Sequence, residues 1–108
     1  MGEDLLEENA DVLADLAARG VDLARTRQVD FTAVFASEAA ADRFAAVAAA
    51  EGFSGKVERS GCVEALPWDV VVCCEMVPST EAVTGAEIRL GILAAAEGGR
   101  TDGWGFPG

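Results

Sequence analysis

The most informative part of the sequence is residues 68–78, WDVVVCCEMVP. Its five consecutive apolar residues, 70–74, include three valines, whose β-branched side chains favour strands. A strand with one face in water would alternate apolar and polar residues, so this run predicts a strand that is buried on both faces. Pro78 cannot donate a hydrogen bond to a sheet and therefore marks the end of the strand. We expect this strand to lie in the middle of a sheet.

The composition predicts a folded, strongly acidic protein. The chain has 108 residues, of which 51% are hydrophobic, and this favours a single domain over residues 1–108. Nineteen acidic residues against eight basic ones give a formal net charge of -11. Such a surface repels nucleic acid and acidic membranes and favours basic protein segments. We therefore expect a basic protein partner, with no direct nucleic acid binding and no membrane association.

Histidine and cysteine usage argues against a metal site or cofactor. The chain has no histidine, which excludes histidine-based acid–base catalysis and histidine metal ligation. Its cysteines, Cys62, Cys73 and Cys74, show no CxxC spacing, so neither a zinc site nor a disulfide framework is expected. Cys73 and Cys74 are neighbours in the predicted strand and point to opposite faces. We expect small buried cysteines in a cytoplasmic protein, since no signal peptide or membrane span is recognisable.

The first predicted element is an acidic helix within residues 1–22, ended by Gly20. Apolar side chains at helical spacing form one stripe along it: Leu5, Leu6, Val12, Leu13 and Leu16. Six acidic residues occupy its other faces: Glu3, Asp4, Glu7, Glu8, Asp11 and Asp15. These acids form either a solvated surface or a docking surface for a basic partner.

We expect residues 25–106 to form a compact core that consists of two halves in sequence. In the first half, a strand over 25–36 alternates apolar and polar residues, and Ser37 caps a helix over 38–51 that Gly52 ends. A strand over 53–60 carries charges and a glycine, which is typical of a sheet edge.

In the second half, the strand described above is followed by a helix that ends at Gly98-Gly99. This helix begins at Ser79-Thr80 or at Thr84, and we favour the earlier start. Ile88, Ile92 and Ala95 share one of its faces. A last strand over 100–106 surrounds Trp104, where flanking glycines allow a bend or a bulge.

The order of these elements is βαββαβ behind an additional N-terminal helix. It predicts a ferredoxin-like α+β sandwich with an antiparallel four-stranded sheet, whose first and third strands are central. Two helices would cover one face of this sheet. Because residues 70–74 are apolar on both faces, we expect the N-terminal helix to cover the other face.

Catalytic arrangements are missing from the sequence, so we do not expect an enzyme. No glycine-rich phosphate loop is present, and Asp69 and Glu75 are separated by roughly 20 Å along an extended strand, too far for joint acid–base work. Trp68 and Trp104 remain as candidates for recognition. Each either seals an end of the core or anchors a partner beside an acidic residue.

Four segments resemble the regulator of ribonuclease E activity B (RraB) family, and they occur in the family's order. They are Val29-Asp30-Phe31, Gly52-Phe53, residues 68–76 (WDVVVCCEM) and Asp102-Gly103-Trp104-Gly105. The resemblance spans almost the whole chain. It implies a ferredoxin-like fold and an acidic protein that binds ribonuclease E and inhibits its cleavage of RNA.

The hypothesis from these observations is a non-catalytic regulator that binds a basic protein, possibly ribonuclease E. We expect the interaction surface to combine the acidic face of the first helix with the terminal motif, through Glu7, Glu8, Asp11, Asp102 and Trp104. Two alternatives stay open: a small-molecule sensor domain, and an immunity-type inhibitor of another basic protein. The oligomeric state also stays open and includes a homodimer.

Overall fold

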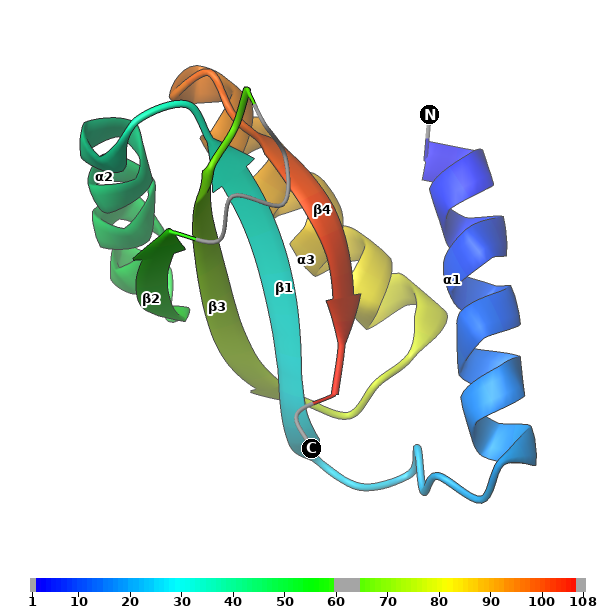
Figure 1. The fold of residues 1–108 in the computed structure, drawn as a ribbon. Coiled ribbons are helices and arrows are strands. Elements are labelled where there is room, and N and C mark those ends of the chain that lie inside the picture. Colours follow the sequence, from blue (N-terminus) through cyan, green and yellow to red (C-terminus); the bar gives the residue numbers. More distant parts are fainter. Residues whose placement is uncertain (1, 60–64, 107–108) are drawn as a thin grey trace.

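The run that begins at Trp68 forms β3, Trp68–Met76, an interior strand of the sheet (Figure 1). β3 pairs antiparallel with β1, Arg27–Phe35, and on its other side with β2, Ser54–Arg59. β4, Arg100–Gly105, pairs antiparallel with β1, so the strand order is β2-β3-β1-β4. The first and third strands of the core are therefore central, and the charged strand β2 is at an edge, as predicted.

The structure is a computed structural model that describes residues 2–59 and 65–106. Cys62 therefore lies outside the described residues. The described part contains three helices, α1 (Gly2–Ala18), α2 (Glu38–Ala50) and α3 (Thr80–Ala96). After α1 the elements follow the order βαββαβ, so the ferredoxin-like α+β plan predicted from the sequence is confirmed.

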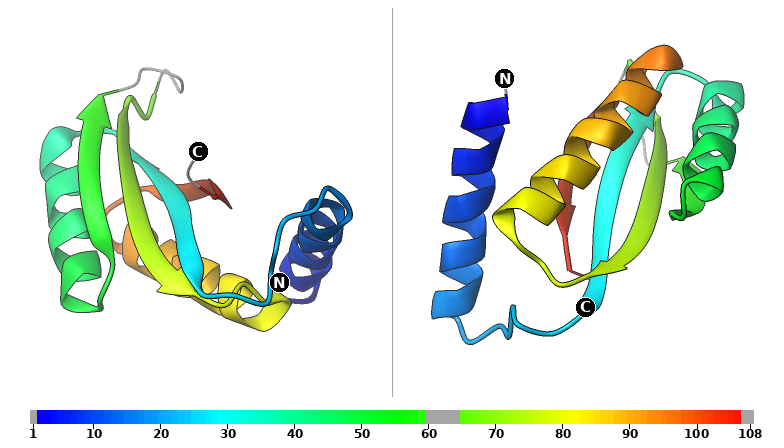
Figure 2. Two further views of the ribbon diagram at one scale, coloured as in Figure 1. Left: turned by 90° about the horizontal axis from the view of Figure 1, so that it is seen from below. Right: turned by 180° about the vertical axis from the view of Figure 1, so that it is seen from behind.

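Helices α2 and α3 cover one face of the sheet (Figure 2). The hydroxyls of Ser37 and Ser79 accept hydrogen bonds from the first turns of α2 and α3, which satisfies backbone donors that have no partner within the helix. α3 thus begins at the earlier of the two predicted starts. Both helices end at glycines with positive φ, Gly52 and Gly98, where a side chain would be strained.

The core lies between this helical layer and the sheet. Alternate residues of β1 and β3, among them Phe31, Phe35 and Val72, are buried against the helices. The rings of Phe35 and Phe44 lie 4.9 Å apart between their centroids, which joins β1 to α2. Phe44 is the large core side chain of an otherwise alanine-lined helix. The small alanines around it let α2 approach the sheet closely.

The other face of the sheet contradicts one prediction. No helix of the described residues covers it, and Val71 and Cys73 of β3 are only half-buried. The opposing residues of β1 on this face include Gln28, Asp30 and Thr32, which make it too polar to receive the apolar stripe of α1. Cys74 points to the helical side and is also half-buried, so the expectation of small buried cysteines was wrong for both.

Instead, α1 packs against α3 and lies beside the edge strand β4 (Figures 1 and 2). Leu13 is buried in this contact, whereas Leu6 and Val12 of the predicted stripe are 36% and 44% exposed. The face of α3 that carries Ile88 and Ile92 is exposed as well, since Val83, Leu90 and Ala94 face the core.

Candidate protein-binding site

A β-bulge in β4 aims Trp104 toward the helices. Ala33 pairs with Thr101 and Phe31 with Trp104, so two residues of β4, Asp102 and Gly103, oppose a single residue of β1. Gly103 has a φ of 98°, a conformation that glycine adopts without a steric penalty. The extra residue turns the strand so that Trp104 packs against the core on the same side as Phe31. The bulge predicted around Trp104 is therefore confirmed.

Asn9 links α1 to both α3 and β4. Its side chain is 3% exposed, and its Nδ2 donates to Thr84 Oγ1 at 2.9 Å and to Glu87 Oε1 at 3.0 Å. Its Oδ1 accepts a hydrogen bond of 2.9 Å from Trp104 Nε1. Burial of the Asn9 amide does not destabilise the fold, because both its nitrogen and its oxygen make hydrogen bonds that replace those to water. We call this set of contacts the Asn9 link.

Asn9 and Glu87 were not predicted from the sequence, although Asn9 has a recognisable position. It stands four residues after Leu5 and four before Leu13, on the stripe that faces the rest of the protein. A polar residue on such a stripe requires a partner elsewhere in the chain. Its partners are 75 to 95 residues away in the sequence, which local patterns do not reveal.

An open groove of about 480 Å³ lies between α1 and β4, and members of the Asn9 link are part of its lining. We call it the α1–β4 groove. The described residues that line it are Glu8, Asn9, Asp11, Val12, Glu87, Gly103 and Trp104. It thus brings together three of the five predicted site residues, Glu8, Asp11 and Trp104.

The other two predicted site residues lie outside this groove. Glu7 is exposed on α1, one turn before Asp11. Asp102 is exposed at the bulge, where its Oδ1 lies 3.4 Å from Arg100 Nη1 in an ion pair. Exposed pairs of this kind contribute little to stability, so Asp102 can exchange Arg100 for another cation.

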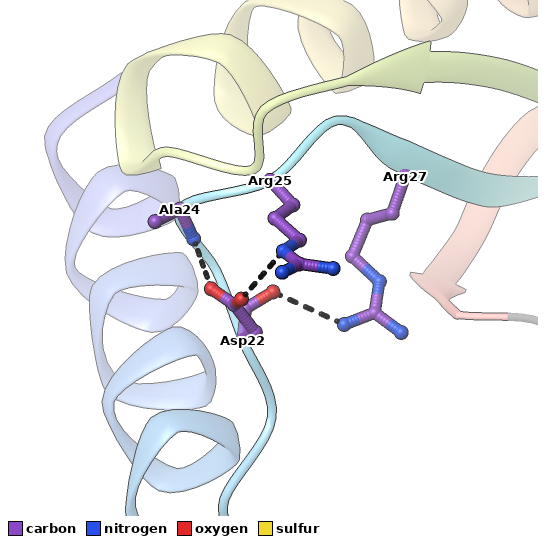
Figure 3. A network of polar contacts seen from close by, with 4 residues as sticks. All are labelled: Asp22, Ala24, Arg25 and Arg27. Carbon is purple, nitrogen blue, oxygen red and sulfur yellow. Dashed lines mark hydrogen bonds and ion pairs between the residues drawn. The ribbon is translucent and has the colours of Figure 1, made fainter.

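The connection from α1 to β1 is held by Asp22 (Figure 3). Its Oδ1 accepts a hydrogen bond of 2.9 Å from the backbone N–H of Ala24, and its Oδ2 pairs with Arg25 Nε at 3.2 Å. Its backbone carbonyl accepts a hydrogen bond of 3.3 Å from Arg27 Nη1. The guanidinium of Arg27 also lies 4.4 Å from the centroid of the Phe106 ring. These contacts join the connection to the start of β1 and to Phe106.

A second groove, of about 560 Å³, lies at the end of the sheet where Gln28, Cys73 and Glu75 meet. Gln28 Nε2 is 3.3 Å from Cys73 Sγ. Burial raises the pKa of the Cys73 thiol, and the neighbouring Asp30 raises it further. A raised pKa keeps the thiol protonated at neutral pH, so Cys73 is poorly suited to act as a nucleophile.

Among the described residues, no group of three or more histidine, cysteine, aspartate or glutamate side chains could hold a metal ion. No helix in residues 2–59 and 65–106 is long and apolar enough to cross a membrane.

The fold and the α1–β4 groove define an acidic, ferredoxin-like α+β protein in which a tryptophan and three carboxylates line one groove. The chain belongs to the RraB family: residues 6–106 match the family model described as Regulator of ribonuclease activity B. The resemblance seen in the sequence is thereby confirmed. A comparison with curated proteins found no match. The matched residues include the whole α1–β4 groove, and membership places the protein among regulators of a ribonuclease activity.

Proposed function

We propose that the protein is a non-catalytic regulator that binds ribonuclease E in the cytoplasm and inhibits its cleavage of RNA. The observation that carries this proposal is the family match over residues 6–106. The net charge of -11 supports a basic region of the enzyme as the contact, because opposite charges accelerate association and favour one partner over others. The same charge repels RNA phosphates, so inhibition would act through the protein rather than through the RNA.

The binding surface in this proposal consists of the exposed acids of α1 and the bulge of β4. Glu7, Glu8 and Asp11 are exposed, and Glu8 and Asp11 line the groove together with Trp104. Asp102 extends the acidic surface along β4. A half-buried tryptophan next to exposed carboxylates offers a basic segment both apolar contact and charge.

Calorimetric titration of the purified protein into ribonuclease E from the same organism, at low salt, tests the target. The triple variant Glu7→Ala, Glu8→Ala, Asp11→Ala should bind about tenfold more weakly, because three exposed attractive charges are lost. The matched control Glu38→Ala, Asp42→Ala, Glu75→Ala removes the same charge elsewhere and should bind like the unmodified protein. Unchanged affinity of the first variant would rule out α1, and no binding at micromolar concentration would remove ribonuclease E as the target.

The groove at Gln28, Cys73 and Glu75 favours a second candidate function, a small-molecule sensor. A thermal-shift screen of metabolites should then give a stabilised complex that is lost in the Gln28→Ala variant. A third candidate, an immunity-type inhibitor of another basic protein, would be recognised by a pull-down that recovers a basic protein other than ribonuclease E.

A further inference from the structure

We propose that the α1–β4 groove is a pocket for one arginine side chain of the bound protein, with the guanidinium stacked on the Trp104 indole among the carboxylates of Glu8, Asp11 and Glu87. This inference rests on the proposed function, because the arginine belongs to the protein that is regulated. It adds to that function a specific chemistry and a further residue, Glu87.

The groove has an apolar floor that suits the flat face of a guanidinium. Val12 is 44% exposed there, and Gly103 has open space where a side chain would start. The polar atom of the Trp104 indole is already satisfied, since Nε1 donates to Asn9. Part of the indole packs against the core and against the Phe106 ring, 5.9 Å away between centroids, and the part that lines the groove offers the apolar and π contact that attracts a cation.

The charge of the groove is not neutralised by the chain itself. Glu8, Asp11 and Glu87 line it, and none of the described lining residues is basic. All eight lysine and arginine residues of the chain are engaged elsewhere. Six form ion pairs, namely Arg19, Arg25, Arg43, Lys56, Arg89 and Arg100. The two others, Arg27 and Arg59, lie over aromatic rings.

Those two arginines indicate which cation fits. The Arg27 guanidinium lies 4.4 Å from the Phe106 centroid, and that of Arg59 lies 5.5 Å from the Trp68 centroid. Trp104 has no such arginine among the described residues, although three carboxylates line the groove beside it. A partner's arginine would complete the same arrangement.

A guanidinium also fits this groove better than a metal ion or an ammonium group. The three carboxylates do not form a cluster that could hold a metal ion. A guanidinium is planar, stacks on an indole and donates several hydrogen bonds in its plane, so it can contact Trp104 and two carboxylates at once. A lysine ammonium is compact and more strongly hydrated, and it cannot stack in this way.

The test uses the Trp68→Phe variant of the full chain, in which Trp104 is the only tryptophan. The probes are acetylated and amidated pentapeptides of the sequence Gly-Leu-Arg-Leu-Gly, with lysine or the uncharged analogue citrulline replacing arginine in two controls. The arginine peptide should change the Trp104 fluorescence saturably, with an affinity about tenfold higher than the lysine peptide. The citrulline peptide should give no change. Equal responses to the arginine and citrulline peptides, or no response to either, would overturn the proposal.

Glu87→Gln in the same background tests the further residue. Glutamine keeps an Oε1 that can accept from Asn9, so the fold should be retained, and circular dichroism checks this. The arginine peptide should bind about tenfold more weakly, whereas Glu38→Gln, a charge change on α2, should have no effect. Unchanged affinity in a folded Glu87→Gln variant would contradict the role of this carboxylate.

Titration of ribonuclease E into the same variants separates this inference from the proposed function. If the enzyme binds but the arginine peptide does not, the arginine pocket is wrong and the proposed function stands. If the peptide binds but ribonuclease E does not, the pocket stands and the target is wrong.

Discussion

Asn9 is the side chain on which the position of α1 depends. The Asn9→Ala variant loses hydrogen bonds to Thr84, Glu87 and Trp104 and leaves the buried Thr84 hydroxyl and the Trp104 N–H without that partner. We expect the free energy of unfolding to fall by about 2 to 3 kcal/mol, because unsatisfied buried polar groups are costly. Urea denaturation measures this change.

The control for this variant is Glu7→Ala, which changes an exposed residue of the same helix. Its free energy of unfolding should stay within about 0.5 kcal/mol of the unmodified protein. A similarly small loss for Asn9→Ala would show that the packing of Leu13 and its neighbours, rather than the Asn9 link, holds α1 in place.

At the level of elements, Gly99 at the junction between α3 and β4 has the least space for a side chain among the glycines that the structure describes. A Cβ atom on Gly99 would collide with the Phe35 ring and with the carbonyl oxygen of Val34. Gly99→Ala should therefore lower the free energy of unfolding by about 2 to 3 kcal/mol, since a packed core cannot accept the extra atom without moving. The matched control is Gly105→Ala in β4, where a Cβ would meet no atom within 4 Å.

Thermal unfolding of both variants distinguishes collision from a general effect of replacing glycine. The Gly99→Ala variant should melt at a clearly lower temperature, and the Gly105→Ala variant should melt close to the unmodified protein. Equal losses in the two variants would mean that the conformational freedom of glycine matters here more than the space beside Phe35.

The elements themselves could be predicted from the sequence because their signals are local. Ser37 and Ser79 cap helices within three residues of their own position, and Gly52 and Gly98 end those helices. The strand order followed from the same information once the charged strand β2 was assigned to an edge. Five apolar residues in β3, however, did not reveal that one face meets Gln28, Asp30 and Thr32 across the sheet.

The site could be predicted only in part, because much of it depends on contacts between residues that are distant in the sequence. Trp104 and the acids of α1 were recognised by residue type and charge, and the groove does join Glu8 and Asp11 to Trp104. Glu87 and Asn9 have partners on other elements, so their importance depends on packing that a local pattern does not contain. The position of α1 beside α3, rather than across the sheet, also depends on packing between elements that are distant in the sequence.

For the whole molecule, the excess of acidic residues predicts opposite effects of salt on folding and on binding. Raising NaCl from 0.05 to 0.5 M should raise the melting temperature, because the repulsion within a chain of net charge -11 is screened. The same change should weaken binding to ribonuclease E by about tenfold or more, since the attraction between partners is screened too. Differential scanning fluorimetry and calorimetry measure the two effects.

Two charge variants separate these effects. Removing three acids reduces the net charge from -11 to -11 + 3 = -8, whether the acids are Glu7, Glu8 and Asp11 or Glu38, Asp42 and Glu75. Both variants should show a smaller salt effect on melting. Only the first should show a smaller salt effect on binding, and an equal reduction in both would mean that no particular surface is used.

The Asn9 link also has a consequence for biosynthesis. Asn9 and Trp104 are 95 residues apart, so at ribosomal rates of about 5 to 20 residues per second roughly 5 to 20 s pass between their syntheses. Helix α1 is made before α3 and β4, so the Asn9 link cannot be complete until both have been synthesised. Until α3 has been made, the apolar stripe of α1 lacks the helix against which it packs, and we expect its many carboxylates to keep it soluble. We therefore expect the acids proposed to recognise a partner to protect the unfinished chain from aggregation as well.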